Sequence, residues 1–209
     1  MAGDASGDRH DPPQPVPGDH RAGPGALDVA TPVGSSDVSP SERAHRLDEL
    51  GRQVHETYLG ANTTLALAES CTGGMIASAL TAHPGSSGYL LGGVVAYADS
   101  AKRDLLGVPA DVLAAHGAVS AQVATAMASG ARERLGAMVG ASVTGIAGPG
   151  GATPDKPVGL TYVGVADDSG VDVRRVVWSG DRAANRADSA ILVLEVLLER
   201  HATRPEPSG

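Results

Sequence analysis

The sequence predicts an α/β fold, namely a three-layer α/β/α sandwich with a mixed, mostly parallel sheet and a C-terminal antiparallel hairpin. The first observation is the order of periodic segments along the 209 residues: helix, strand, helix, strand, helices, strand, hairpin, helix. The second is that strands separated by helices favour parallel pairing, whereas a late strand–turn–strand segment favours antiparallel pairing. The third is an apolar fraction of 42% with no Phe, so Leu, Val and Ala must build the core.

The first predicted helix has the clearest start in the sequence. Ser39 can cap it, Pro40 occupies the first helical position and Glu42 completes a capping box. Apolar residues then recur at spacings of three and four, which gives one buried face: Ala44, Leu47, Leu50, Val54 and Tyr58. The helix is expected to end at residues 60–62.

The remaining elements follow in order along the chain. Strands are expected at residues 63–68, 92–97 and 137–144. Helices are expected at residues 73–82, 99–106, 110–115 and 120–135, with Asp99 and Ser120 as caps. A hairpin over residues 158–166 and 171–178 and a last helix over residues 182–200 complete the domain.

The first forty residues differ in composition from the rest of the chain. They hold seven Pro, six Gly, six acidic and two basic residues, and no aromatic residue. Such a segment cannot bury enough apolar surface to offset the entropy of ordering it. We therefore expect residues 1–38 to form a disordered acidic tail, residues 39–202 to form one domain, and residues 203–209 to be disordered.

Composition argues against several classes of function. The net charge of -8 and an aromatic fraction of 2% argue against nucleic-acid binding. One Cys cannot form an internal disulfide, and no CxxC or HExxH motif points to a metal site. The sequence shows no apolar run of membrane-spanning length and no secretory signal, so we expect a cytoplasmic protein without a membrane partner.

Three polar motifs follow predicted strands, which is where open α/β sheets bind ligands. The first opens a helix with small and hydroxyl residues that are candidates for substrate binding: Ser70, Thr72, Gly73 and Gly74. Free N–H groups at a helix start suit a phosphate or an oxyanion, but simple capping by Ser70 or Thr72 is an equal alternative. Cys71 is more typical of a buried thiol than of a nucleophile.

The second motif contains Tyr97 at a strand end and Lys102 on the next helix. Lys102 and Lys156 are the only lysines among 16 basic residues, so a position that merely needs a positive charge would more often hold Arg. An amine can lose its proton and act as a base, which a guanidinium cannot do. Lys102 is therefore a candidate general base, whereas Lys156 lies on a Pro-bounded loop and is expected to face solvent.

The third motif is a Gly/Pro-rich loop after the third strand, with Thr144, Gly145, Gly148 and Gly150 as candidate ligands of an anion. A rigid structural turn is the alternative for these glycines. The third motif has neither the GK[ST] ending of a Walker loop nor a GxGxxG pattern that opens a helix. Arg182 and Arg186 share one face of the last helix and are candidates to grip a phosphate, with surface solvation as the alternative.

Together and in this order, these motifs resemble the CinA C-terminal domain family, which includes stand-alone nicotinamide-nucleotide amidohydrolases, also called nicotinamide mononucleotide deamidases. The resemblance covers about residues 45–200. It is carried by Ala68-Glu-Ser-Cys-Thr-Gly-Gly74, Gly85-Ser-Ser87, Gly93-Val-Val-Ala-Tyr97 with Ala101-Lys102, Leu106-Gly-Val108, Gly117-Ala-Val-Ser120, Ser142-Val-Thr-Gly-Ile-Ala-Gly-Pro-Gly-Gly151, Lys156-Pro-Val-Gly159 and Gly180-Asp-Arg182. One departure is Ala98-Asp99, where relatives often have Ser-Asn.

The resemblance implies hydrolysis of nicotinamide mononucleotide to nicotinate mononucleotide and ammonia by a Ser–Lys site without metal or cofactor. It also implies a homodimer. The residues carried over by motif are Ser70, Ser87, Tyr97, Lys102, Thr144 and an Arg of the last helix, with Arg186 preferred over Arg182. We expect Ser87 to attack the carboxamide, Lys102 to take its proton through Ser70, and N–H groups near Gly73 and Gly74 to hold the oxyanion.

Three alternatives stay open at this point. Ser70 can be the nucleophile with Ser87 in support. The chain can instead be a non-catalytic nucleotide-binding or regulatory module, which would bind a nucleotide without releasing ammonia. It can also be a scaffold that recruits a partner through the acidic tail, in which case deletion of residues 1–38 would abolish function.

Overall fold

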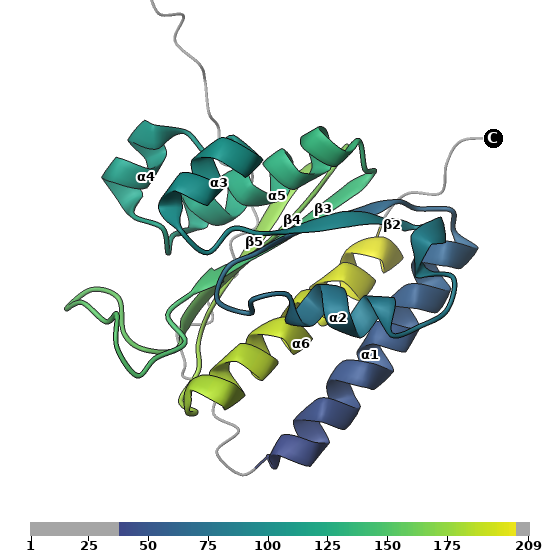
Figure 1. Ribbon diagram of the computed structural model, residues 1–209, viewed down its shortest axis with the longest axis horizontal. Coiled ribbons are helices and arrows are strands. Elements are labelled where there is room, and N and C mark those ends of the chain that lie inside the picture. Colours follow the sequence, from purple (N-terminus) through teal and green to yellow (C-terminus); the bar gives the residue numbers. More distant parts are fainter. Residues whose placement is uncertain (1–37, 204–209) are drawn as a thin grey trace, which may run out of the picture.

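The computed structural model describes residues 38–203, in which a five-stranded sheet lies between two layers of helices (Figure 1). The elements are α1 (Pro40–Gly60), β1 (Leu65–Glu69), α2 (Met75–Thr81), the 3₁₀ turn η1 (Ser86–Gly88), β2 (Leu90–Val95), α3 (Asp99–Leu106), α4 (Ala110–His116), α5 (Ala121–Leu135), β3 (Val139–Gly145), β4 (Leu160–Asp167), β5 (Gly170–Val177) and α6 (Arg182–Ala202). The three-layer α/β/α prediction is confirmed. Of the two segments predicted to be disordered, 1–38 and 203–209, residues 1–37 and 204–209 lie outside the described residues.

The strand order is β2-β1-β3-β4-β5. β1 pairs in parallel with both β2 and β3, whereas β4 pairs antiparallel with β3 and with β5. Only β4 therefore runs against the other strands, and the predicted hairpin is β4–β5. This topology brings the carboxyl ends of β1, β2 and β3 to one edge of the sheet, where polar loops can converge.

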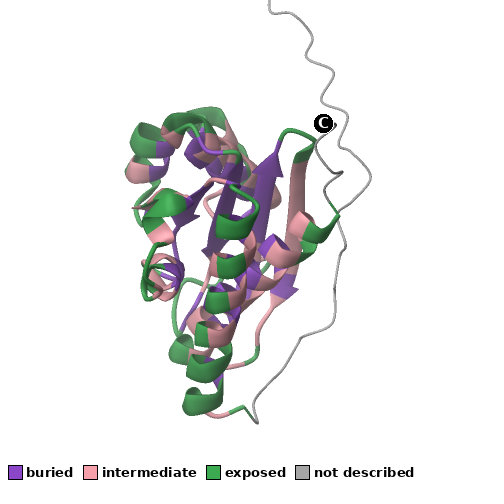
Figure 2. Cartoon of the chain, turned by 90° about the vertical axis from the view of Figure 1, so that its right-hand side faces the viewer, coloured by how far each residue is buried: buried purple, intermediate pink, exposed green. Residues whose placement is uncertain are grey.

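Helices α1, α2 and α6 cover one face of the sheet, and α3, α4 and α5 cover the other (Figure 1). The apolar residues of the core are mostly aliphatic, and Figure 2 shows the buried residues concentrated in the strands and on the inward faces of the helices. Glycines allow close packing in this aromatic-poor core: a Cβ on Gly130 would lie 1.9 Å from the carbonyl oxygen of Leu106, and one on Gly140 would lie 2.2 Å from that of Ala128.

Local signals set most helix starts, and two expectations need correction. The capping box of Ser39 and Glu42 is present, and the Ser120 hydroxyl accepts the Val123 N–H. Asp99, however, does not cap α3, because the N-cap residue is Ala98. The second strand begins at Leu90, two residues earlier than expected, because the apolar pair before Gly92 continues the pairing with β1.

None of the helices in residues 38–203 combines the length and hydropathy needed to cross a membrane.

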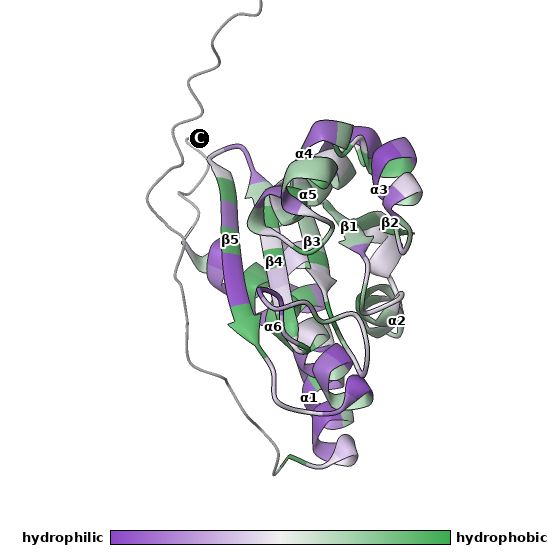
Figure 3. Cartoon of the chain, turned by 90° about the vertical axis from the view of Figure 1, so that its left-hand side faces the viewer, coloured by the Kyte–Doolittle hydropathy of each residue, from purple (hydrophilic) through white to green (hydrophobic). Residues whose placement is uncertain are grey.

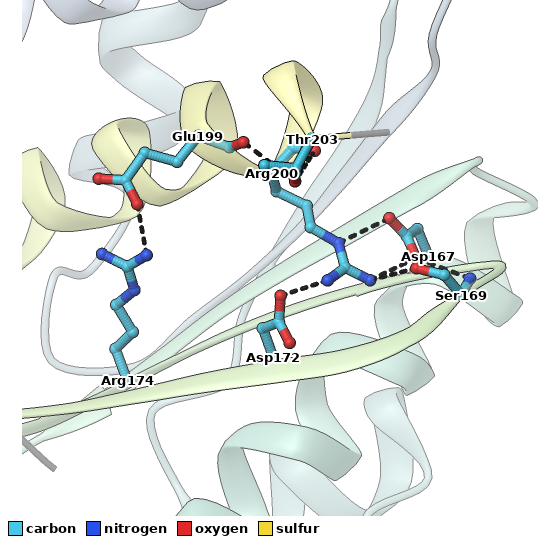
Figure 4. Close-up of polar contacts among 7 residues, drawn as sticks. All are labelled: Asp167, Ser169, Asp172, Arg174, Glu199, Arg200 and Thr203. Carbon is cyan, nitrogen blue, oxygen red and sulfur yellow. Dashed lines mark hydrogen bonds and ion pairs between the residues drawn. The ribbon is translucent and has the colours of Figure 1, made fainter. Parts of the chain in front are cut away.

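An ion-pair network fastens the end of α6 to the β4–β5 hairpin (Figure 4). Two guanidinium nitrogens of Arg200 donate to the Asp167 carboxylate at 2.8 and 2.7 Å, and a third donates to Asp172. Burial of Asp167 opposes its ionisation, but hydrogen bonds from Arg200 and Ser169 outweigh this and hold the pKa of the carboxyl well below its usual range. The folded state therefore favours ionised Asp167.

Replacement of Asp167 by Asn is expected to lower the free energy of unfolding at pH 7 by about 3 kcal/mol, because the mostly buried Arg200 loses the carboxylate that accepts two of its hydrogen bonds and keeps only Asp172 as a charged partner. Since the folded-state pKa is depressed, this stabilisation is present above about pH 4 and is lost as the pH falls below that value. Urea unfolding of both proteins at pH 7 and pH 3 measures the effect. Asp104→Asn, which alters an exposed pair with Arg103, is the control and should change little.

Candidate active site

A pocket of about 230 Å³ lies where the carboxyl ends of β1, β2 and β3 meet. Five chain segments supply its walls. These are the residues after β1 (Ser70 and Cys71), the β2–α3 segment (Tyr97, Asp99 and Lys102), the α4–α5 segment (Ala118 and Val119), the end of β3 with its loop (Thr144 and residues from 145 to 151), and the start of α6 (Arg182). The parallel arrangement of the three strands thus gathers most of the residues that the sequence singled out.

Lys102 projects from α3 into this pocket and is almost completely buried, with 1% of its surface exposed. Its Nζ donates to the Tyr97 carbonyl oxygen at 3.2 Å and lies 3.5 Å from the Asp99 carboxylate, which is itself largely exposed. The amine therefore has one close acceptor and one distant, solvated counter-ion. Nζ therefore keeps hydrogen-bonding capacity for a group that enters the pocket.

Ser70 directly follows β1 and is the serine that shares the pocket with Lys102. Its backbone N–H donates to the Val143 carbonyl at 3.0 Å, which fixes the residue against β3. Within residues 38–203 the Ser70 hydroxyl has no hydrogen-bond partner, so it is available to a ligand. Burial raises the pKa of the neighbouring Cys71 thiol to about 11, which leaves little thiolate at neutral pH and makes Cys71 a buried thiol, as expected.

Glu69 organises the loop after β1, and the sequence analysis assigned it no role. Its buried carboxylate accepts the Thr72 hydroxyl at 2.7 Å and the N–H groups of Gly74 and Ala77 at 2.9 and 2.8 Å. The positive end of α2 is thus already occupied by a negative side chain. An acidic residue just before a Gly-opened helix was the signal that could have revealed this cap.

This arrangement corrects the expectation for Thr72, Gly73 and Gly74. The Thr72 hydroxyl and the Gly74 N–H are both committed to Glu69, and the Gly73 N–H donates to the Ser70 carbonyl at 3.2 Å. These three donors are therefore committed to the Glu69 carboxylate and the Ser70 carbonyl and are not free to hold an oxyanion. They shape the loop that presents Ser70.

Replacement of Glu69 by Ala is expected to lower the free energy of unfolding by about 2–4 kcal/mol, because several buried donors at the start of α2 lose their acceptor. Urea unfolding followed by circular dichroism measures the change. Glu56→Ala removes an exposed carboxylate that pairs with Arg52 and serves as the control. Equal stability of the Glu69 variant and the wild type would refute the capping role.

Arg182, rather than Arg186, reaches the pocket, which reverses the expected order. Arg182 donates to the carbonyl of Gly148 at 2.8 Å and to the Tyr97 hydroxyl at 3.0 Å, across the pocket mouth. Arg186 lies one turn further along α6 and donates to the carbonyls of Cys71 and Thr72 at 3.1 and 2.7 Å. Arg186 therefore braces the loop that carries Ser70, and Arg182 is exposed at the rim.

The third motif forms the remaining wall. The Thr144 hydroxyl donates to the Ala118 carbonyl at 2.8 Å, and Thr144 is buried at the pocket floor. Gly145 and Gly148 lie so close to Thr161 and Val158 that a Cβ would approach within 2.7 Å, so both glycines are required by packing as well as being candidate ligands. Gly150 is exposed and open to the pocket.

Lys156 is not free in solvent, contrary to expectation. Its Nζ donates to the His116 carbonyl and so ties the loop after β3 to the end of α4.

In the part of the chain that the structure describes, no group of three or more His, Cys, Asp or Glu side chains is arranged to hold a metal ion.

Ser87 lies outside this pocket, and the expected transfer of its proton to Lys102 within one chain is wrong. Ser87 is in η1, before β2 begins, whereas Lys102 follows the end of β2. The six residues of β2 span about 20 Å at roughly 3.3 Å per residue. A direct Ser87–Lys102 contact within one chain, or one relayed by Ser70, is therefore impossible.

The fold and the pocket together define an α/β protein with a small pocket, lined in part by charged residues, at the carboxyl ends of parallel strands. The family model described as the CinA C-terminal domain matches residues 47–201. The chain therefore belongs to the CinA C-terminal domain family.

Known relatives agree with this assignment. A CinA-like protein of Anaeromyxobacter sp. (strain K) is 51% identical over 150 residues, which cover 72% of this chain but 37% of the relative. The chain thus spans less than half the length of that relative. The crystal structure of the competence/damage inducible protein CihA from Agrobacterium tumefaciens is similar with a TM-score of 0.72 and 40% identity, covering 74% of this chain and 94% of that one. The competence damage-inducible protein A from Klebsiella pneumoniae is similar with a TM-score of 0.74 and 33% identity, covering 76% and 99%.

Proposed function

We propose that this protein is a metal-independent amidohydrolase that converts nicotinamide mononucleotide to nicotinate mononucleotide and ammonia in the cytoplasm, as part of pyridine nucleotide recycling. The observation that carries the proposal is the shared pocket of Ser70 and Lys102, with Arg182 at its rim. An unpaired hydroxyl beside a buried amine is the combination that nucleophilic catalysis by a Ser–Lys pair requires. The resemblance to nicotinamide-nucleotide amidohydrolases supplies the substrate class.

In the proposed reaction the Ser70 hydroxyl attacks the carboxamide carbon while the uncharged amine of Lys102 takes its proton. The carbon–nitrogen bond then breaks, and Lys102 returns the proton to the leaving nitrogen, so ammonia departs. Water adds to the resulting ester with the help of the same amine, and nicotinate mononucleotide is released with Ser70 restored. Each step needs only one nucleophile and one group that both takes and gives a proton.

The size of the pocket fits one end of the substrate. A volume of about 230 Å³ is below the ~300–1,000 Å³ of sites that enclose drug-sized ligands, so it suits the pyridine ring rather than the whole nucleotide. The phosphate would then lie at the mouth, near Arg182 and the glycine N–H groups of residues 145–151. Tyr97 and Thr144 would orient the ring or the ribose.

The test is ammonia release from nicotinamide mononucleotide by purified protein in the presence of a metal chelator. Nicotinamide, which lacks the ribose and phosphate, is the matched comparison and should be a poor substrate. Binding of the nucleotide without ammonia release would instead favour the non-catalytic module.

Replacement of Arg182 by Ala is expected to raise KM for nicotinamide mononucleotide about 10–100-fold with a smaller change in kcat, because a charge-assisted contact to phosphate contributes about 1.5–3 kcal/mol. Steady-state kinetics measure both constants. Arg175→Ala, on β5 and away from the pocket, is the control. An unchanged KM would remove Arg182 from the substrate site.

A further inference from the structure

A hollow of about 640 Å³ lies where α1, the start of α2 and the start of α6 meet, on the face of the sheet that these helices cover (Figure 1). It shares no lining residue with the candidate active site. We call this hollow the α1–α6 groove. Apolar residues of its wall come from all three helices: Ala44, Leu47, Met75, Ala183, Ala184 and Ala187.

The charged residues of the groove already have partners within the fold. Figure 3 shows that α1 is mostly hydrophilic, so the apolar wall is a local departure from the character of that helix. Arg43 pairs with Asp188 at 2.8 Å, and the Asp181 carboxylate accepts the Ala184 N–H at 2.8 Å. What the groove offers to an occupant is therefore mainly apolar surface.

The described part of the chain begins at the rim of this groove. Val38 is the first described residue, and both Val38 and Pro40 line the groove. The Arg43 guanidinium donates to the Val38 carbonyl, which holds this point of the chain against α1. Residues 1–37 therefore join the fold at the groove itself.

The part of residues 1–37 nearest to the groove carries most of their aliphatic side chains. Apart from Ala, the aliphatic and Met residues of this segment are Met1, Val16, Leu27, Val29 and Val33. Three of these five fall within residues 27–33. The remainder of the segment is rich in Gly, Pro and acidic residues, so residues 27–33 are its best match to an apolar groove.

The spacing of residues 27–33 suits an extended segment that lies in the groove. Along an extended chain, Leu27 and Val29 face one side and Asp28 faces the other. Pro32 favours an extended conformation of the residue before it. The chain from Val33 to Val38 can span about 17 Å, and that from Leu27 about 37 Å, so the tether is long enough to reach along the groove.

We propose that residues 27–33 bind in the α1–α6 groove of the same chain, with Leu27, Val29 and Val33 against its apolar wall. The covalent tether favours this occupant over a separate partner. A short linker gives an effective concentration of about 1 mM, so a segment with a dissociation constant of about 1 mM would fill about half of the grooves.

The bound segment would also contact the start of α6. Asp181 and Ala183 line the groove and flank Arg182, which lines the candidate active site. Binding of residues 27–33 would therefore hold the backbone that carries Arg182. It does not depend on the proposed reaction.

Paramagnetic broadening of methionine methyl signals tests the proposal in the full chain. Of the four methionines, Met75 lies in the groove, Met127 is buried on α5 and Met138 precedes β3. A nitroxide is attached at Ala30→Cys, where the side chain would face away from the groove, while the buried Cys71 is shielded from the reagent. The Met75 signal is expected to lose about half of its intensity, and the Met127 and Met138 signals much less.

Substitutions in the segment separate binding from mere tethering. Leu27→Ser, Val29→Ser and Val33→Ser together, in the same spin-labelled chain, should restore the Met75 signal because the apolar contacts are lost. Val16→Ser removes an aliphatic side chain from outside the segment and should leave the broadening unchanged. Persistence of the broadening after the three serine substitutions would overturn the proposal, as would its absence from the labelled chain without them.

A substitution in the groove tests the other partner. Ala44→Glu places a carboxylate in the apolar wall and should restore the Met75 signal. His45→Glu, at the next exposed position of α1 and outside the groove, is the matched control and should keep the broadening. Unchanged Met127 and Met138 signals show that each variant is folded. Equal broadening in folded Ala44→Glu and His45→Glu would contradict binding in the groove.

A mixed sample distinguishes the same chain from a second copy. Spin-labelled chains without isotope are combined with chains that carry ¹³C-methyl methionine and no spin label. The Met75 signal should be unaffected, because residues 27–33 bind within their own chain. Broadening of Met75 in this mixture would assign the groove to the segment of another copy and overturn the proposal.

Discussion

Replacement of Lys102 by Met is expected to lower kcat for ammonia release about 10³-fold or more while the protein stays folded. Methionine preserves an unbranched apolar stem in a site that is 1% exposed, so packing changes little. What disappears is the amine that, in the proposed reaction, takes the proton of the attacking hydroxyl and returns it to the leaving nitrogen. General acid–base catalysis by one group contributes about 10²–10⁴-fold, and here one group serves both steps.

Two further variants separate the role of the proton from that of the charge. Lys102→Arg keeps a positive charge but cannot release a proton near neutral pH, so it is expected to be as inactive as Lys102→Met. Arg103→Met changes the neighbouring exposed residue of α3 and should retain activity. Circular dichroism and thermal unfolding confirm the fold of each variant. Wild-type kcat in Lys102→Met would eliminate the Ser–Lys mechanism.

The fold was predictable because its signals are local. The capping box at Ser39, the Ser120 cap and the glycines after β1 and β3 mark where elements begin or end, and spacings of three and four mark the buried faces. The boundaries of β2 were not predictable, because Leu90 and Leu91 could belong to a loop or to a strand. Only pairing with β1 decides between the two.

The residues of the candidate site were predictable where the order and direction of the strands alone determine which side chains lie together. Ser70 follows β1, Thr144 is next to last in β3 and Lys102 lies on the helix after β2, and parallel pairing of the three strands places these ends together. Ser87 and Lys102 are close in sequence, but the intervening residues form an extended strand, which separates them. The choice between Arg182 and Arg186 depended on which turn of α6 faces the pocket, and spacing cannot reveal that.

Glu69 shows a different limit of reading the sequence. Glycines before a helix suggest free N–H groups, but a buried carboxylate at the end of β1 occupies them first. The Glu69 carboxylate already accepts these donors in the folded chain, and a second anion there would meet a like charge, so the structural use prevails. The anion site that we propose therefore consists of Arg182 and the loop after β3.

Replacement of Ser70 by Ala is expected to lower kcat about 10³-fold or more, with KM and stability close to wild type, if Ser70 forms the covalent intermediate. Its hydroxyl makes no hydrogen bond within residues 38–203, so its removal leaves no buried partner unsatisfied. Ser78→Ala, at an exposed position on α2, is the control and should be fully active. Loss of kcat without loss of stability is the signature of a group that acts only in the reaction.

Acid quenching during turnover followed by peptide mass spectrometry identifies the acylated residue directly. An acyl adduct on the peptide containing Ser70, absent in Ser70→Ala, would establish it as the nucleophile. An adduct on Ser87 together with an active Ser70→Ala would reverse the roles of the two serines. Because β2 separates Ser87 from Lys102 within one chain, that outcome would require the attacking oxygen and its base to come from different subunits. The nucleophile assay therefore also tests whether a single subunit can complete the reaction.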